Sequence, residues 1–146
     1  MVVIEKTITK HVGVLIHTTD LEITNYLKTI LAPLQLAPEQ HLIIALLLKE
    51  EGLSQNQIAV QLNKDKSSVA RMLDSLEKKG FLIRAKCPVD HRSSKIFLTE
   101  AGKELKDAVE NISTVTRELI SKGLTEEEIG ELKRLLMIIR KNVSQQ

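Results

Sequence analysis

The chain has 146 residues, 42% of them hydrophobic, which suits one compact domain or one domain with an oligomerisation region added to it. Aromatic residues make up only 2%, which argues against surfaces that bind RNA or single strands by stacking bases on aromatic rings. The net charge is +2 at pH 7, and this total excludes little by itself.

Positive charge is concentrated in the middle of the chain. Residues 64–95 contain nine Lys or Arg and four Asp or Glu, a net charge of +5, which leaves −3 for the other 114 residues. A basic segment in an otherwise acidic chain is expected of a protein that binds a polyanion. An unevenly charged, solvated surface is the alternative interpretation.

Cysteine content and hydropathy bear on the compartment. Cys87 is the single cysteine, so no internal disulfide can form and a reducing compartment is expected. No N-terminal stretch has the basic start, apolar run and small-residue cleavage site of a signal peptide. The longest apolar run, residues 42–48, is too short to cross a bilayer. We therefore expect a soluble, cytoplasmic protein that does not enter a membrane.

Two helices are predicted in the first third of the chain. Apolar residues recur at helical spacing from position 8 to position 31, ending before Pro33, with a polar interruption at residues 17–20. Pro38 is a plausible first-turn residue of the second helix, which runs to about Glu50, before Gly52.

The next two helices are short and lie close together in the sequence. Ser54 and Gln57 have the spacing of a capping box, and Asn63 can take the left-handed conformation that ends the helix. Asp65 is a good N-cap for the following helix, which is predicted to end at Gly80. Two helices joined by a three-residue turn at 54–79 have the form of a helix-turn-helix.

The periodicity changes to two after Phe81. Residues 82–86 and 95–98 are predicted to form the strands of a hairpin. Thr99 then caps a long helix, and Thr125 with Glu128 forms a capping box for the last one. The expected order is four helices, a hairpin and two helices. The fold class is therefore mainly α with a small β-hairpin (α+β).

The outward face of the second helix of the helix-turn-helix is suited to DNA. It carries Ser67, Ser68, Arg71, Ser75 and Lys78. Short hydroxyl side chains permit close approach, the helix N-terminus favours phosphate, and the fork of Arg71 suits a guanine edge or a phosphate. The outward acids, Asp74 and Glu77, lie toward the flank or the end of this face.

A basic hairpin directly after a helix-turn-helix is a wing. Arg84, Lys86, Arg92 and Lys95 place four cations on the two strands and their connection. An arginine at a hairpin tip can enter the minor groove, where the negative potential is enhanced. Asp90 can pair with Arg92 and orient it.

Cys87, Asp90 and His91 fall within five positions and raise the alternative of a metal or nucleophilic site. A metal site needs three or four converging ligands, and no fourth one lies nearby. A nucleophilic site needs an oriented base and a pocket that excludes water, which a hairpin tip does not offer. We expect no metal, no cofactor and no enzymatic activity. An ordinary strand thiol is the first interpretation of Cys87, and a redox switch is the alternative.

The segments DKSSVARMLDSLEKKGFLIR (65–84) and DHRSSKIFLTEAG (90–102) resemble the MarR (multiple antibiotic resistance regulator) family of winged-helix transcription factors. The resemblance includes the D-x-R of the wing (Asp90, Arg92) and the L-T-x-x-G entry into the next helix (Leu98, Thr99, Gly102). Residues 36–40 also resemble the start of the family's second helix. Ala37 and His91 depart from the family pattern, which often has a Thr or Ser cap and a second wing arginine at these positions.

The resemblance implies a homodimer with residues 1–34 and 103–146 as its helical dimerisation region and 35–102 as a winged helix-turn-helix DNA-binding domain. It implies that Ser67, Ser68 and Arg71 contact bases and phosphates, and that Arg92 enters the minor groove. Together with the charge pattern, the expected DNA-binding residues are Lys66, Ser67, Ser68, Arg71, Ser75, Lys78, Arg84, Lys86, Asp90, Arg92 and Lys95.

Members of this family commonly release DNA when a small, often aromatic or anionic, effector binds between the dimer helices and the winged lobe. His17, Asp20 and His41 are the candidate contacts for such a ligand, and solvated helix residues are the alternative interpretation of each.

We therefore expect a sequence-specific transcriptional regulator, a repressor, that binds a pseudo-palindromic site in double-stranded DNA as a homodimer and is released by an effector. Two alternatives lack sequence-specific DNA binding: a ligand- or redox-sensing dimer, and a winged-helix protein–protein adaptor. An adaptor would need an exposed apolar patch on the second helix of the helix-turn-helix.

Overall fold

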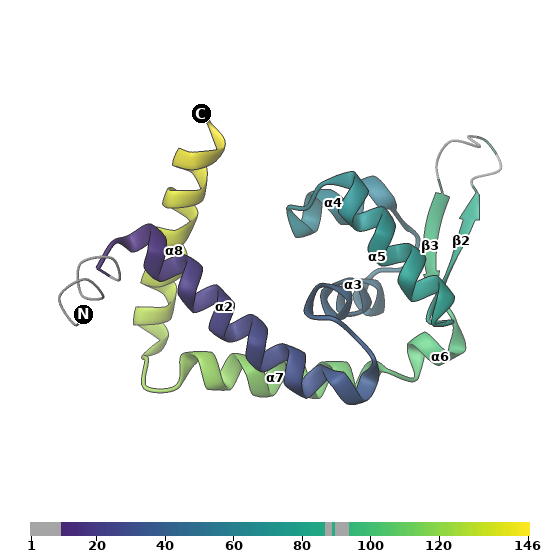
Figure 1. Ribbon diagram of the computed structural model, residues 1–146, viewed down its shortest axis with the longest axis horizontal. Coiled ribbons are helices and arrows are strands. Elements are labelled where there is room, and N and C mark those ends of the chain that lie inside the picture. The colour runs from purple at the N-terminus through teal and green to yellow at the C-terminus, as the bar shows by residue number, and fades with distance from the viewer. Residues whose placement is uncertain (1–9, 87–88, 90–93) are drawn as a thin grey trace, which may run out of the picture. The chain divides into compact units, whose positions relative to one another are not determined.

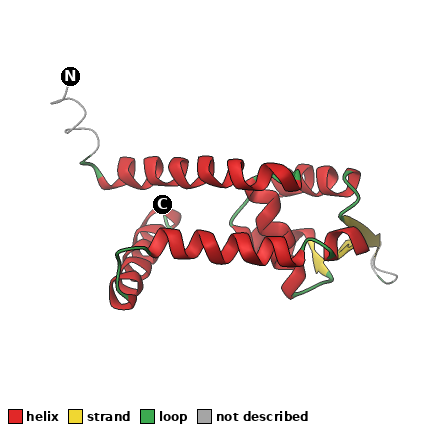
Figure 2. Cartoon of the chain, turned by 90° about the horizontal axis from the view of Figure 1, so that it is seen from below, coloured by secondary structure: helices red, strands yellow, loops and turns green. Residues whose placement is uncertain are grey.

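The computed structural model describes residues 10–86, 89 and 94–146 (Figure 1). The helices are α2 (Val12–Leu31), α3 (Pro38–Lys49), α4 (Gln55–Leu62), α5 (Lys66–Lys78), α6 (Glu100–Lys103), α7 (Lys106–Ser121) and α8 (Glu126–Ser144), with a 3₁₀ turn, η1 (Ala32–Leu34). The strands are β1 (Leu53–Ser54), β2 (Leu82–Lys86) and β3 (Ser94–Leu98). Figure 2 shows how small the sheet is beside the helices, so the expected fold class is confirmed.

The chain divides into two compact units, Met1–Glu110 and Asn111–Gln146. The core of the first unit is aliphatic, because its fully buried side chains are nearly all Leu, Ile and Val. They are Leu31, Ile43, Ile44, Leu47, Ile58, Val69, Leu73, Leu76, Leu82, Ile96 and Val109. Helix α3 contributes three of them and packs against α2, α5 and β3, which makes it the central element of this unit.

The predicted caps of α4 and α5 are confirmed. The Ser54 hydroxyl accepts a hydrogen bond from the Gln57 amide (3.1 Å), and the Gln57 side chain accepts one from the Ser54 amide (2.8 Å). Asn63 has the left-handed conformation (φ 53°) that ends α4. Two residues later Asp65 caps α5. The turn between the helices is therefore three residues long, as the sequence predicts.

Helix α5 ends in a Schellman motif at Gly80, whose φ of 82° is left-handed. The Phe81 amide donates to the Leu76 carbonyl and the Gly80 amide to the Glu77 carbonyl, both at 3.0 Å. The chain then turns directly into β2, so the motif sets where the hairpin leaves α5.

The sheet has the order β1-β3-β2 and is antiparallel throughout. The predicted hairpin is present, with a register that runs from Leu82 opposite Leu98 to Lys86 opposite Ser94. Strand β1 was not predicted. It pairs Leu53 with Ile96, and two residues are too few for an alternating pattern to be recognised in the sequence.

The long helix predicted to begin after Thr99 is interrupted, so this prediction was wrong in extent. Thr99 caps the four-residue helix α6, and α7 starts only at Lys106. Gly102 is buried within α6 and lies against the backbone of Phe81, where an added Cβ would come within 2.1 Å of the carbonyl oxygen. The close approach holds α6 against the end of α5, and the chain starts a new helix beyond it.

The second unit contains the end of α7 and all of α8. The expected capping box is confirmed, since the Thr125 hydroxyl accepts from the Glu128 amide (3.1 Å) and the Glu128 side chain from the Thr125 amide (2.9 Å). No residue of α8 is buried. Nine large apolar side chains of this unit are exposed in the single chain.

Among the described residues no single helix is both long and apolar enough to span a membrane. Val12–Leu34 and Pro38–Lys49 satisfy length and hydropathy only as a pair bent by 68°.

We expect Gly102→Ala to lower the free energy of unfolding by about 2–3 kcal/mol, because the added methyl group forces the Phe81 backbone to move. Urea denaturation followed by circular dichroism measures this change. Gly130→Ala is the control: it lies in α8, meets nothing within 4 Å, and should be neutral or stabilising by up to about 1 kcal/mol. Equal stability of the two variants would contradict the proposed close packing.

Candidate nucleic-acid interface

The N-terminus of α5 is organised by Asp65. One carboxylate oxygen accepts from the Ser68 amide (2.7 Å) and the other from the Ser68 hydroxyl (3.0 Å). The hydrogen bond from the Ser68 amide, helped by the hydroxyl, holds the pKa of the Asp65 carboxyl below its ordinary value. The Asp65 carboxylate thus already occupies the Ser68 amide, which is not available to another anion unless this bond breaks.

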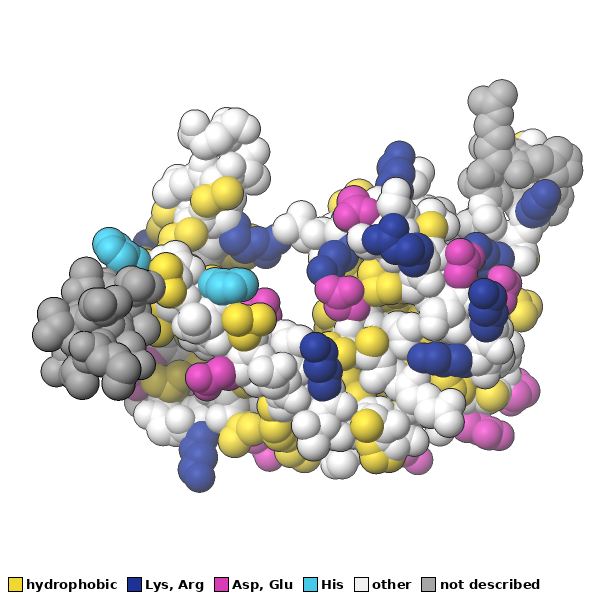
Figure 3. Space-filling model, in the orientation of Figure 1, with side chains coloured by type: hydrophobic (Ala, Val, Ile, Leu, Met, Phe, Trp, Pro, Cys, Tyr) yellow, Lys and Arg dark blue, Asp and Glu magenta, His cyan; other side chains and the backbone are white. Residues whose placement is uncertain are grey.

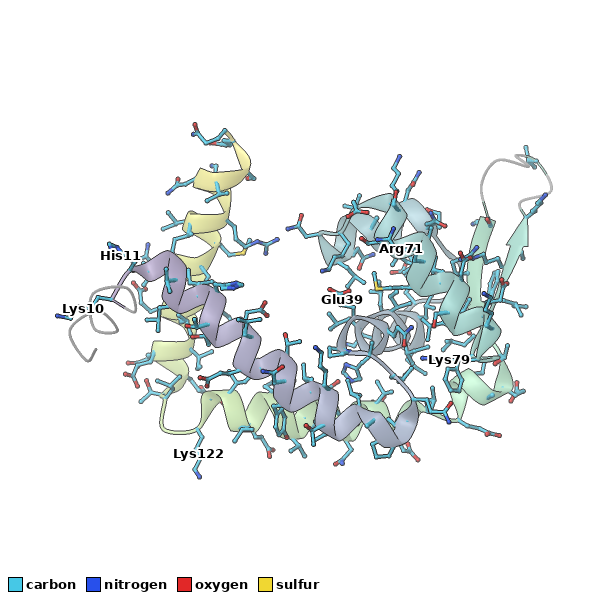
Figure 4. The ribbon with its side chains drawn as sticks, viewed as in Figure 1. Lys10, His11, Glu39, Arg71, Lys79 and Lys122 are labelled. Atoms are coloured by element: carbon cyan, nitrogen blue, oxygen red, sulfur yellow. The ribbon has the colours of Figure 1, made fainter. Side chains whose placement is uncertain are left out.

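Arg71 continues this chain of contacts. Its Nη2 donates to the Ser68 hydroxyl at 3.2 Å, and its side chain is exposed on α5 (Figure 4). Because Ser68 is itself held by Asp65, the guanidinium is oriented along the N-terminal turn of the helix. An arginine oriented before binding loses less side-chain freedom when it meets a base edge or a phosphate.

The outward face predicted for α5 is only partly outward. Lys66, Ser67, Arg71 and Lys78 are exposed, and Ser68 is half-buried. Ser75 differs, because its hydroxyl accepts from Gln40 Nε2 (3.0 Å) on α3. Each step of four residues turns a helix by about 40°, so the row that starts at Ser67 has rotated toward α3 by Ser75.

The wing cations divide between the two faces of the hairpin. Arg84 Nη2 donates to the Ala70 carbonyl (3.1 Å) and pairs with Asp74 (2.8 Å), which ties β2 to α5. Side chains alternate along a strand, so Lys86 lies on the same face of the hairpin as Arg84. Lys95 pairs with Ala85 and therefore lies on the opposite face. Asp90 and Arg92, predicted at the tip, lie outside the described residues, as do Cys87 and His91.

Two lysines that were not among the predicted DNA-binding residues lie at the two ends of α5. Lys64, in the turn before α5, forms an ion pair with Glu39 of α3. Lys79, at the end of α5, donates to the Gln35 carbonyl in the α2–α3 connection and to the Gln40 side chain of α3. Figure 3 shows Lys and Arg side chains gathered over the part of the surface that carries α4 and α5. No local pattern marks these pairings, since their partners are 25 and 44 residues away.

Comparison with known proteins finds similar arrangements in regulators of one family. The MarR family model matches residues 36–94. The transcriptional regulator SlyA is 28% identical over 89% of this chain and 94% of its own, with a TM-score of 0.78. MepR of S. aureus in complex with DNA is 25% identical (90% and 98%, TM-score 0.85). The transcriptional repressor CouR bound to a 23-mer duplex is also 25% identical (93% and 96%, TM-score 0.81). The winged-helix part of the chain, residues 36–94, therefore matches the MarR family.

The MarR-type entry into the helix after the wing has a physical basis here. Thr99 donates its amide to the Phe81 carbonyl (3.1 Å) and its hydroxyl to the Gly80 carbonyl (2.5 Å). The same hydroxyl accepts from the Gly102 amide (3.1 Å). Thr99 and Gly102 thus join α6 to the end of α5.

Gln40 partly replaces the helix cap that is lost because Ala37 stands where the MarR pattern often has Thr or Ser. Ala37 is the N-cap of α3 and has no side chain that can cap the helix. The side chain of Gln40 accepts from the Ala37 amide at 3.0 Å. One half of a capping box is therefore kept.

The candidate effector residues are in different environments. His17 and Asp20 are exposed on α2, while His41 is buried on α3 with Nε2 3.4 Å from the Val109 carbonyl. Burial lowers the pKa of His41, and the contact with Val109 opposes this effect. Among the described residues no three His, Cys, Asp or Glu side chains come together as metal ligands would.

Burial of His41 predicts a pH dependence of stability. Its folded-state pKa lies below the ordinary value of 6.5, so the unfolded chain binds the proton more readily. The stabilisation is complete above pH 6.5 and is lost as the pH falls below that value. Chemical denaturation of the wild type and His41→Gln between pH 8 and 5 measures the difference. The variant should lose less stability on acidification, and equal losses would contradict the burial of this imidazole.

Proposed function

We propose that this protein is a DNA-binding transcriptional regulator of the MarR family that recognises a pseudo-palindromic site as a homodimer. The observation that carries the proposal is the exposed basic face of α5, where Arg71 is oriented by Ser68 and Asp65. Residues 35–102 form the proposed DNA-binding domain, and 1–34 with 103–146 the proposed dimerisation region. MepR in its DNA complex and the repressor CouR on its duplex support this assignment by similarity.

The exposed side chains of α5 are the proposed base and phosphate contacts. Arg71 and Ser67 reach into the major groove, and Lys66 and Lys78 bind the flanking phosphates. The wing adds Lys86 and Lys95, which lie on opposite faces of the hairpin and so straddle the backbone beside the groove. Arg92 remains the proposed minor-groove residue at the tip, with Asp90 orienting it.

Charge and hydropathy on α5 argue against the adaptor alternative. Large hydrophobic side chains are exposed in several elements, but none of them belongs to α5, which is described throughout. A helix that docks on a protein partner needs an apolar face. The exposed residues of α5 are instead hydroxyl-bearing or charged, as a surface that meets DNA requires.

Exposed apolar side chains in the predicted dimerisation region support a homodimer. In the second unit they are Val115, Leu119, Ile120, Leu124, Leu132, Leu135, Met137, Ile138 and Val143, each at least 42% exposed. Helix α2 of the first unit likewise exposes Val12, Leu15, Ile16 and Leu21. A second copy of the chain is the partner that would cover these surfaces in a closed, symmetric assembly.

Repression and release by a small aromatic or anionic effector complete the proposal. A repressor blocks transcription while bound, and release requires only a ligand that favours the unbound arrangement of the lobes. His17 and Asp20 are the proposed contacts, because they are exposed on α2. His41 is buried and would act through packing. A regulator of DNA is expected in the cytoplasm.

Selection of duplexes that bind the protein from a random DNA pool should enrich an inverted repeat with half-site centres about 10 bp apart. Recovery of no common motif would contradict a sequence-specific regulator.

Arg71→Ala should then weaken operator binding by about 1–3 kcal/mol, roughly five- to 150-fold, if it reads a base. Fluorescence anisotropy at fixed salt measures the affinity. Lys122→Ala removes one positive charge from the turn between α7 and α8 and should have little effect. Equal affinity of wild type and Arg71→Ala would exclude the proposed docking of α5.

Replacing Leu135 and Ile138 of α8 together by Gln should raise the dimer dissociation constant at least tenfold. Each apolar side chain that loses its burial costs about 1.5–3 kcal/mol, and a symmetric interface contains it twice. Sedimentation velocity across a concentration series measures this change. Lys133→Gln, on the same helix, is the control and should remain dimeric. A monomeric wild-type protein would refute the dimer outright.

A further inference from the structure

Two adjacent lysines at the end of α5 have different surroundings. Lys78 is the last residue of the helix and is exposed. The Lys79 ammonium donates to the Gln35 carbonyl at 2.5 Å and to Gln40 Oε1 at 2.9 Å (Figure 4). Both lysines lie at the end of a helix proposed to enter the major groove, and both are exposed. Lys79 differs in that its ammonium is bonded to groups of the connection before α3 and of α3 itself.

Gln40 joins the start of α3 to the end of α5. It is only 7% exposed. Its Oε1 accepts from both Lys79 and the Ala37 amide, and its Nε2 donates to the Ser75 hydroxyl (3.0 Å). A buried amide whose oxygen and nitrogen are both bonded specifies one arrangement of its neighbours, because any displacement leaves a polar group unpaired.

The carbonyl of Gln35 brings a third element into this network. Gln35 ends η1, between α2 and α3, in a left-handed conformation (φ 58°) that is uncommon for a residue other than glycine. Its carbonyl accepts from Lys79, whose ammonium also lies at the negative end of the α5 dipole. Through Lys79 and Gln40, the last turn of α5 is therefore bonded to the segment between α2 and α3 and to the first turn of α3.

We propose that Lys79 and Gln40 are positioning residues, which set the angle of α5 against α3 and do not contact DNA. This inference rests on the proposed function, because it assumes that α5 reads the operator. Base contacts need α5 at one angle in the groove, whereas contacts with phosphates tolerate small rotations. Loss of the network should consequently reduce discrimination between DNA sequences more than it reduces attraction to DNA.

The test compares Lys79→Met with Lys78→Met. Affinities are measured for the selected operator and for a random duplex, each over a series of salt concentrations, after denaturation curves show that the variants are folded. Each phosphate contact contributes about 0.9 to the slope of log affinity against log salt concentration. A lysine bound to phosphate and a lysine that positions α5 therefore give different results.

For Lys79→Met we expect operator affinity to fall at least tenfold, random-duplex affinity to stay within twofold, and the salt slope to stay unchanged. For Lys78→Met we expect the affinities for both duplexes to fall. The salt slope should decrease by about 0.9 per protomer, the contribution of one phosphate contact. A reduced slope with equal losses on both duplexes in Lys79→Met would make Lys79 a phosphate contact and overturn the inference. Unchanged affinities in that variant would overturn it as well.

Variants at Gln40 separate positioning from a general loss of packing. Gln40→Met removes the hydrogen bonds and should behave like Lys79→Met. Gln40→Glu keeps acceptors for Lys79, for the Ala37 amide and for the Ser75 hydroxyl, which can donate as well as accept. It should therefore keep the preference for the operator that Gln40→Met loses, and loss of that preference in Gln40→Glu contradicts the network.

A wild-type protein that does not prefer the operator overturns the proposed function and this inference together. Preference retained in Lys79→Met overturns the inference alone.

Discussion

The close packing of Gly102 against Phe81 is the constraint on which the first unit depends. At this point α5 ends in a left-handed glycine, β2 begins and α6 returns, and Gly102 meets the Phe81 backbone with no room for a side chain of its own. Thr99 donates to the carbonyls of both Gly80 and Phe81. The helix proposed to read DNA, the hairpin and the path toward α7 are thus joined at one point of the backbone.

From this junction, polar side chains hold α5 along its whole length. Asp65 caps its N-terminus, Arg84 binds its middle from β2, and Lys79 binds its C-terminal end to the connection before α3. Each contact uses a charged group, and the ion pair among them, Arg84 with Asp74, is part-exposed and contributes about 1 kcal/mol or less. Their value lies in geometry. Arg84 and Lys79 tie α5 to β2 and to the connection before α3, which restricts how α5 can rotate on an aliphatic core whose packing is non-directional.

Features with local causes could be predicted from the sequence, and those with distant causes could not. Ser54, Asp65 and Gly80 act within four residues of themselves, so both ends of α5 and the start of α4 were predicted correctly. Strand β1 exists only because β3 lies beside it, and the break before α7 follows from the packing of Gly102. The inward contacts of Ser75 and Arg84 depend on α3 and on Asp74, which no spacing in the sequence indicates.

The same distinction applies to charge. Nine Lys and Arg between residues 64 and 95 suggest a broad cationic surface, yet Lys64, Lys79 and Arg84 have partners inside the first unit. A cation that is bonded within the protein releases no counterion when DNA arrives unless that bond is broken first. The basic segment therefore combines two kinds of cation, exposed ones proposed to attract the phosphate backbone and internally bonded ones such as Lys79, proposed to keep α5 at the angle at which base edges can be read.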